Sequence, residues 1–266
     1  MSEIIEDERD ESKMHDQSTF VDEADADSSE GEMAKDKKKP YEILELINVD
    51  SRVTFIRTQI TDRKEVLLFV LSSISDETWL SRFSQNVALM KSYRRRLEIT
   101  ARDIEEKFSK EKESEITKIS GEKVVSELAR KSVIESLKYA DIPLGEVLKE
   151  MKTGNPGFDF FSESIDGIPL FGEAKYVNGS NAYGKALKQI LEFVEEYKDE
   201  ADFANINDFI SKVGREKMGK GIRGFMAGFS ALSTPSADLI DGIKKNIHYQ
   251  TINLRSSEII LVAINV

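Results

Sequence analysis

Asp159, Glu173 and Lys175 are the residues of this chain whose types and spacing are best suited to chemistry. The two carboxylates offer the hard oxygen ligands that Mg²⁺ and Mn²⁺ prefer, and the backbone carbonyl of Ala174 is a candidate for a further ligand. A metal held there would lower the pKa of a bound water and polarise a phosphoryl oxygen. The Lys175 ammonium can orient that water and offset the negative charge that develops. These residues predict metal-dependent hydrolysis of a phosphodiester bond, with Mg²⁺ or Mn²⁺ as cofactor.

A β-hairpin over residues 157–177 is expected to position these side chains. Asp166-Gly167 lies between two short apolar runs, a pattern typical of a hairpin turn. Asp159 then lies on the first strand, whereas Glu173 and Lys175 share one face of the second, because side chains alternate along a strand. Two other interpretations remain open. A Glu-x-Lys pair on a strand is also a common surface ion pair, and Asp159 can simply precede a turn.

The composition removes several competing chemistries. The chain has 266 residues, no Cys and two His, at positions 15 and 248. Disulfides, Cys-based zinc sites and a thiol nucleophile are therefore excluded, and neither a multi-His metal site nor a His-based triad is expected. An enzyme of this composition must rely on carboxylates, lysines and a hard cation.

The net charge of −11 is concentrated at the N-terminus. Residues 1–40 contain 14 acidic and 6 basic residues, a balance of −8, so the other 226 carry −3. With so few apolar residues, we expect a disordered acidic tail over 1–40, acting either as a solubilising leader or as a mimic of nucleic acid in a basic groove. The start is acidic where a secretory signal would be basic, and the longest apolar runs are too short to cross a bilayer. We expect a cytoplasmic protein with no membrane partner.

Residues 41–118 are expected to form an N-terminal α+β lobe. The alternation over 53–60 predicts a strand, and the apolar run over 65–71 predicts a second strand that pairs with it. A helix is expected from Asp76 to about Tyr93, followed by a charge-dense helix to about Lys112. This lobe can select the target, dimerise or dock a partner.

Residues 119–266 are expected to form an α/β domain, with a mixed central sheet flanked by helices. Helical patterns cover about 120–139, 182–197 and 237–246, a strand or loop edge is expected over 146–152, and a closing strand covers 258–265. Glu122 lies in the first turn of the first helix, where it either complements the helix dipole or binds the metal, and Glu127 competes for that metal role.

Two segments offer candidate substrate contacts. Lys185 and Gln189 lie off the apolar stripe of the 182–197 helix, and Gln189 is equally readable as a plain exposed residue. The segment 212–224 is rich in Gly and basic residues and includes Arg215, Lys220 and Arg223, which can contact phosphates while the glycines let the backbone approach. A solvated flexible loop is the alternative.

Asp159, thirteen further residues and then Glu173-Ala174-Lys175 resemble the PD-(D/E)XK nucleases, which have the restriction-endonuclease-like fold. Gly121-Glu122 matches the place where that family often carries an accessory acid, and Asn155-Pro156 stands slightly upstream of the expected Pro-Asp pair. Gln189 and Tyr197 resemble the family's auxiliary positions. The resemblance covers about 120–200 and the final strand, and not the N-terminal lobe. It implies an endonuclease that acts on DNA.

Within that family, the sequences Gly-Phe-Asp, Phe-Gly-Glu-Ala-Lys and Ala-Leu-Lys-Gln-Ile are similar to nuclease subunits of bacterial anti-phage systems of the Hachiman type. This similarity implies a helicase or ATPase partner and a role in antiviral defence. Duplex cleavage needs two sites, so a homodimer is also expected. Two other functions remain open: a binding or regulatory subunit that is active only, or never, outside a complex, and a structural protein in which Asp159 and Glu173 lie apart.

Overall fold

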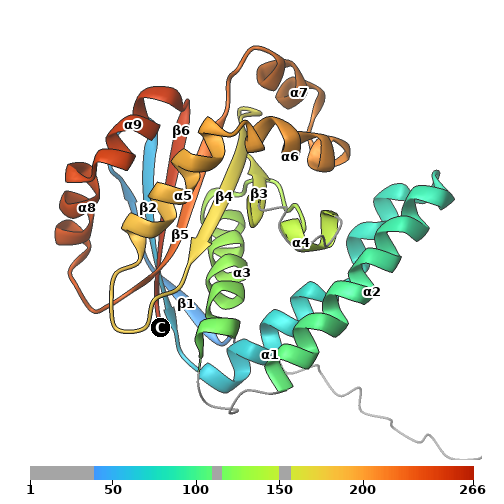
Figure 1. The fold of residues 1–266 in the computed structure, drawn as a ribbon, viewed down its shortest axis with the longest axis horizontal. Helices are drawn as coiled ribbons and strands as arrows, with labels where there is room; N and C mark the ends of the chain where they lie inside the picture. Colours follow the sequence, from blue (N-terminus) through green and yellow to red (C-terminus); the bar gives the residue numbers. More distant parts are fainter. Residues whose placement is uncertain (1–38, 110–115, 150–156) are drawn as a thin grey trace, which may run out of the picture. The chain divides into compact units, whose positions relative to one another are not determined.

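The computed structural model describes residues 39–109, 116–149 and 157–266, which centre on one six-stranded sheet with helices on both faces (Figure 1). The strand order is β1-β2-β6-β5-β4-β3. The strands are β1 Tyr41–Asn48, β2 Val53–Ile60, β3 Phe160–Glu163, β4 Pro169–Lys175, β5 Gly224–Ala231 and β6 Glu258–Asn265. The helices are α1 Arg63–Ile74, η1 Thr78–Phe83, α2 Val87–Ser109, α3 Lys118–Leu137, α4 Gly145–Leu148, α5 Tyr183–Glu195, α6 Lys198–Ile206, η2 Asn207–Phe209, α7 Lys212–Gly219, α8 Ser236–Lys245 and α9 Ile247–Arg255.

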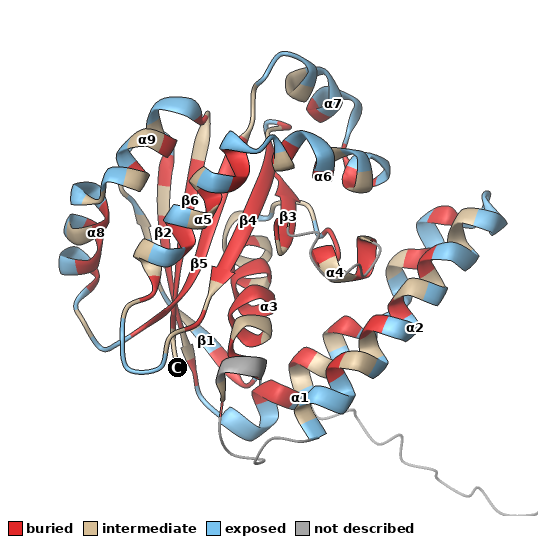
Figure 2. Cartoon of the chain, in the orientation of Figure 1, coloured by how far each residue is buried: buried red, intermediate tan, exposed pale blue. Residues whose placement is uncertain are grey.

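The sheet is mixed, which confirms the expected α/β class. Strands β2, β6, β5 and β4 run parallel, and the edge strands β1 and β3 are each antiparallel to their neighbour. The two innermost strands are buried along nearly their whole length, as expected for parallel strands covered on both faces (Figure 2). Helices α5, α8 and α9 pack on one face, and α1 and α3 pack on the other.

The first two strands belong to the same sheet as the rest. Residues Val53 to Gln59 of β2 pair in parallel with Ile259 to Asn265 of β6. Residues 39–266 accordingly form one compact unit, and the expected 41–118 lobe shares its sheet with the expected 119–266 domain. The acidic tail lies outside the described residues, except for positions 39 and 40.

The prediction of a strand over 65–71 is wrong, because this run lies in α1. The side chain of Asp62 accepts a hydrogen bond from the amide of Glu65 and thereby caps the helix. The buried residues of α1 recur at helical spacing: Val66, Leu67, Val70 and Ile74. The antiparallel partner of β2 is instead β1.

Other element boundaries also differ from the expectation. A 3₁₀-helix over Thr78–Phe83 precedes one continuous helix, α2, where a break near residue 93 was expected. The segment beginning at Glu146 lies in the short helix α4 up to Leu148, and its expected continuation over 150–152 lies outside the described residues.

The segment 212–224 is not a loop throughout. Its first eight residues form α7, and the Ser211 side chain caps that helix by accepting a hydrogen bond from the amide of Gly214. Strand β5 follows from Gly224. Among the described residues, no helix is long and apolar enough to cross a membrane.

Candidate active site

The hairpin that was expected from Asp166-Gly167 is present. Residues Phe160 to Glu163 of β3 pair with Gly172 to Pro169 of β4 in antiparallel register. Gly167 adopts a φ of 79° in the turn, a conformation that glycine accepts at little cost. The pairing places Asp159 directly before β3, opposite the strand that carries Glu173 and Lys175.

The hydrogen bonding between the two strands of the hairpin extends to Asp159, one residue before β3 begins. Its amide donates to the carbonyl of Gly172 at 2.8 Å, and its carboxylate Oδ2 accepts from the amide of Ala174 at 2.9 Å. Its carbonyl accepts from the amide of Gly145 in α4 at 2.7 Å. The backbone and the carboxylate of Asp159 are therefore both tied to neighbouring segments, so the direction of the side chain is set by the fold.

Lys175 joins two carboxylates. Its Nζ lies 2.8 Å from Oε1 of Glu173 and 3.7 Å from Oε1 of Glu122. The Glu173 side chain is 2% exposed, and that of Glu122 is 42% exposed. The structure thus brings together the expected pair and the accessory acid, with one carboxylate inside the protein and one at its surface.

A close approach of α3 to β4 allows Glu122 to reach this lysine. A Cβ atom at Gly121 would lie 2.3 Å from the ring of Tyr176, so only glycine lets the helix pack against that ring. Glu122 follows Gly121 on the helix, and Tyr176 follows Lys175 on the strand. The distance between Glu122 and Lys175 therefore depends on the absence of a side chain at position 121.

The titration behaviour of the two central groups reflects this crowding. Burial raises the pKa of Glu173 well above its usual range, and the nearby Asp159 carboxylate raises it further, while Lys175 opposes the shift. Burial lowers the pKa of Lys175, but Glu173 and Asp159 outweigh burial, so the net shift is upward. Lys175 is therefore held as an ammonium beside these carboxyl groups.

One carboxylate oxygen in this site has no hydrogen-bond partner in the part of the chain that the structure describes. Oε2 of Glu173 is buried and accepts no hydrogen bond from the described residues. Leaving a buried acceptor unsatisfied costs about 1–3 kcal/mol, and a cation beside it would remove that cost.

Within the described parts of the chain, no three carboxylate or imidazole side chains gather closely enough to form a complete metal cage. Mg²⁺ does not need one, since it is commonly held by one or two carboxylates together with water and substrate phosphates. Asp159 and Glu173 fit that mode.

Two lysines near the carboxylates were not anticipated from the sequence. Lys123 forms an ion pair with Glu146. Burial lowers the pKa of its ammonium below the usual value, and the nearby Asp159 and Glu122 offset this shift only in part. Lys149 forms an ion pair with Asp202 at 2.7 Å. Lys123 directly follows Glu122 in the sequence, which is the only local signal that pointed to it. The partners of both lysines depend on tertiary packing.

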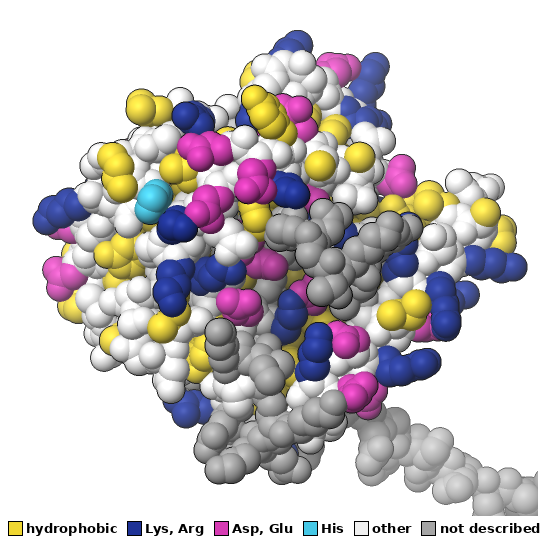
Figure 3. All heavy atoms as spheres, viewed as in Figure 1, with side chains coloured by type: hydrophobic (Ala, Val, Ile, Leu, Met, Phe, Trp, Pro, Cys, Tyr) yellow, Lys and Arg dark blue, Asp and Glu magenta, His cyan; other side chains and the backbone are white. Residues whose placement is uncertain are grey.

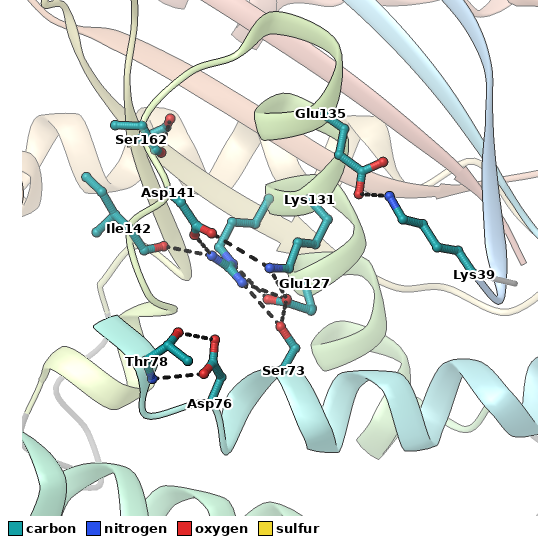
Figure 4. Close-up of polar contacts among 12 residues, drawn as sticks. Lys39, Ser73, Asp76, Thr78, Glu127, Lys131, Glu135, Asp141, Ile142 and Ser162 are labelled. Atoms are coloured by element: carbon teal, nitrogen blue, oxygen red, sulfur yellow. Dashed lines mark hydrogen bonds and ion pairs between the residues drawn. The ribbon is translucent and has the colours of Figure 1, made fainter. Parts of the chain in front are cut away.

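Glu127, the residue that competed with Glu122 for the metal role, has both carboxylate oxygens engaged by other side chains. Both of its oxygens accept hydrogen bonds from the guanidinium of Arg130, at 2.7 and 2.8 Å, and it also accepts one from the hydroxyl of Ser73 (Figure 4). The guanidinium also donates to Asp141 and to the carbonyl of Ile142. This network joins α1 and α3 to the segment before α4, and it engages both oxygens of Glu127 within the fold.

The expected substrate contacts on α5, Lys185 and Gln189, are not hydrogen-bonded to the candidate site in the described structure. Lys185 is exposed and Gln189 is half-buried, and in the described part of the chain no hydrogen bond links either side chain to Asp159, Glu173 or Lys175. Tyr197, the other auxiliary position of the resemblance, follows the helix in a left-handed conformation and is 68% exposed.

The arginines at and after α7 contact backbone carbonyls and a carboxylate of the neighbouring helical segments. The Arg215 guanidinium donates to the carbonyls of Ile210 and Asn207, which stabilises the end of the preceding helical turn. Arg223 forms an ion pair with the fully buried Asp199. Lys220 is exposed just after α7. Of these three, Arg215 and Arg223 have their guanidinium groups engaged in holding the local fold.

Comparisons with protein-family models, with curated proteins and with solved structures return no match for this chain.

Proposed function

We propose that this protein is a Mg²⁺- or Mn²⁺-dependent nuclease that cleaves phosphodiester bonds in DNA. The observation that carries the proposal is the convergence of Asp159, Glu173 and Lys175, with one buried oxygen of Glu173 left without a donor among the described residues. The order of helix α3, hairpin, helix α5 and parallel strand β5 also supports the PD-(D/E)XK resemblance. DNA as the substrate follows from that resemblance.

In this proposal, Asp159 and Glu173 hold the metal, with Glu122 and the Ala174 carbonyl as further ligands. Bound there, the ion would lower the pKa of its water and polarise a phosphoryl oxygen. The chain's own groups do the rest. Lys175 faces both carboxylates and stays protonated, so it can orient the attacking water and offset the charge of the phosphorane-like transition state. The bonds to Asp159 keep its carboxylate fixed, which lowers the entropic cost of reaching the reactive geometry.

A basic stretch of α2 supports a nucleic-acid substrate. Basic side chains gather over this helix in Figure 3, and the exposed ones are Lys91, Arg95, Arg102 and Lys107. Arg95 and Lys107 also form ion pairs with Glu98 and Asp103 of the same helix. The helix is tied to the segment beside the site, because Arg96 donates to the carbonyl of Leu148 and Thr100 donates to that of Glu146. Phosphates bound along α2 would therefore lie on a helix that is bonded to α4, whose Gly145 amide donates to the carbonyl of Asp159. Phosphate contacts of this kind give strongly salt-dependent affinity.

The experiment is cleavage of supercoiled, linear duplex and single-stranded DNA by the purified chain with Mg²⁺ or Mn²⁺. We expect cleavage of at least one substrate, its loss in EDTA, and its loss in Asp159→Ala and Glu173→Ala. Lys188→Ala, which removes an exposed lysine paired with Glu192 on α5, is the matched control and should cleave normally. Equal cleavage by wild type and Asp159→Ala would refute the proposal.

A second candidate is a nuclease subunit that needs a partner for activity. Lys175 bridges Glu173 and Glu122, and Lys123 pairs with Glu146, so lysines already neutralise several of the carboxylates in this state. The similarity to Hachiman-type subunits makes a helicase or ATPase the partner and anti-phage defence the setting. Under this alternative the chain binds Mn²⁺ in calorimetry, with weaker binding in Asp159→Ala, but cleaves DNA only when the partner is added.

A further inference from the structure

Both backbone polar groups of Phe158, the residue before Asp159, are bound by one buried ion pair. The amide of Phe158 donates to Oδ2 of Asp202 at 2.7 Å. The Nζ of Lys149 donates to the carbonyl of Phe158 at 2.6 Å and to the same oxygen of Asp202 at 2.7 Å. Lys149 follows α4 and Asp202 lies in α6, so two separate elements meet at a single residue next to the candidate site.

This arrangement is shielded from water. The side chains of Lys149 and Asp202 are 17% and 8% exposed, and Phe158 is 1% exposed. The Lys149 ammonium also lies 5.1 Å from the ring centroid of Phe161. Charge-assisted hydrogen bonds in such surroundings are stronger and shorter than neutral ones. The pair therefore holds Phe158 more firmly than ordinary backbone hydrogen bonds would.

The chain makes room for the pair at Gly157. A Cβ atom there would lie 2.6 Å from Oδ2 of Asp202 and 2.6 Å from Nζ of Lys149. The φ of Gly157 is not in the left-handed region, so its backbone conformation is open to alanine. An alanine at this position would therefore force the side chains of the ion pair to shift while the main chain keeps its conformation.

We propose that Lys149 and Asp202 are positioning residues for the site, which fix Phe158 so that Asp159 presents its carboxylate in a single direction. This inference rests on the proposed function. From Phe158 onward the path to the metal ligand is short: Asp159 follows directly, and its Oδ2 is bound by the amide of Ala174. Interactions that orient a metal ligand typically change metal affinity or activity by about 10–100-fold when they are removed.

Helix α6 supplies a matched control. Asp199 is also a buried carboxylate with a basic partner, but that partner is Arg223 and neither residue contacts Phe158 in the described structure. Asp202→Asn and Asp199→Asn therefore each remove one buried charge from the same helix. Only Asp202→Asn is expected to change the position of the Asp159 carboxylate.

The first measurement compares Mn²⁺ affinity by calorimetry and amide hydrogen exchange at Ala174, with global stability measured separately by urea unfolding. For Asp202→Asn and for the double variant Lys149→Met/Asp202→Asn, we expect Mn²⁺ binding at least about tenfold weaker than wild type. We also expect Ala174 to exchange faster than the loss of global stability explains. Asp199→Asn should keep wild-type values for both once its stability is taken into account.

A second pair of variants keeps every charge. Gly157→Ala inserts a methyl group into the space beside the ion pair, whereas a Cβ at Gly219 would meet no atom of the described residues within 4 Å. Gly157→Ala should weaken Mn²⁺ binding and accelerate exchange at Ala174, and Gly219→Ala should do neither. If Asp202→Asn does not fold, these two glycine variants decide whether the ion pair positions Asp159.

The outcomes separate the two proposals. If wild type binds Mn²⁺ and cleaves DNA while the Asp202 and Gly157 variants match it in affinity and in exchange at Ala174, the positioning role is refuted and the nuclease function stands. If wild type neither binds Mn²⁺ nor cleaves, the nuclease function is refuted. In that case, amide exchange at Ala174 alone decides whether the ion pair positions Asp159. Exchange in the Asp202 variant equal to that in Asp199→Asn refutes the positioning role, and faster exchange in the Asp202 variant supports it.

Discussion

The amide of Ala174 donates a hydrogen bond of 2.9 Å to Oδ2 of Asp159, a residue fifteen positions earlier in the chain. Strand β3 begins at Phe160, opposite Gly172, so no backbone carbonyl of β3 is available to this amide. The Asp159 carboxylate therefore accepts the hydrogen bond that a backbone carbonyl of a neighbouring strand would otherwise accept. As a result, the second strand of the hairpin itself fixes the position of Asp159 relative to Glu173 and Lys175.

Two substitutions at Asp159 should separate its structural role from its proposed metal role. Asp159→Asn keeps an oxygen that can accept from Ala174, so we expect near-wild-type stability but Mn²⁺ affinity reduced at least about tenfold, which is about 1.4 kcal/mol. Asp159→Leu leaves the amide without its acceptor and should lower the free energy of unfolding by about 1–3 kcal/mol. Urea unfolding and calorimetry measure both. Wild-type Mn²⁺ affinity in Asp159→Asn would remove this residue from the metal site.

A methyl group at Gly121 should separate Glu122 from Lys175. The new Cβ would lie 2.3 Å from the Tyr176 ring, so α3 must move away from β4. Such overpacking typically costs about 1–3 kcal/mol, and we expect DNA cleavage to fall with it. Gly184→Ala in α5 is the control, because a Cβ there has its nearest contact at 3.6 Å and should raise stability by up to about 1 kcal/mol. Both effects are read from urea unfolding, and a stability gain in Gly121→Ala would contradict this packing argument.

Glu127 should prove important for stability and irrelevant to metal binding. Glu127→Ala leaves Arg130 buried without its bidentate partner, and breaking such a pair typically costs about 3–5 kcal/mol. Glu192→Ala, which removes an exposed ion pair with Lys188, should cost less than about 0.5 kcal/mol. Neither variant should change Mn²⁺ affinity under conditions where it is folded. A loss of affinity in folded Glu127→Ala would assign this carboxylate to the metal after all.

The sequence was informative wherever the signal was local. Asp166-Gly167 fixes the hairpin turn, and the turn determines the register that brings Asp159 opposite Glu173 and Lys175. The helix that carries Glu122 could also be anticipated from its apolar spacing. Its approach to Lys175 depends on Gly121 meeting Tyr176, a contact between residues more than fifty positions apart that no periodicity reveals.

Elements with ambiguous signals were predicted wrongly, and elements with weak signals were not predicted. The apolar run over 65–71 suits either a strand or a buried helix, and the cap at Asp62 decides for the helix. Strand β5 consists largely of small residues, including Gly224 and Gly228, which have low strand propensity. A Cβ at Gly228 would lie 2.9 Å from the Cβ of Ala129, so the close packing of α3 accounts for the glycine at this position. A Cβ at Gly224 would instead lie 2.6 Å from the carbonyl oxygen of Glu258.

The most direct test of the nuclease proposal is the single-turnover rate of DNA cleavage by wild type and by Lys175→Met at saturating Mg²⁺. Methionine keeps most of the apolar length of the side chain and removes only the ammonium that faces Glu173 and Glu122. Removing one donor that stabilises transition-state charge typically costs about 10²–10³-fold in rate, so we predict a loss of that size with Mn²⁺ binding retained. Equal rates for the two proteins, with both folded and both binding the metal, would contradict the account.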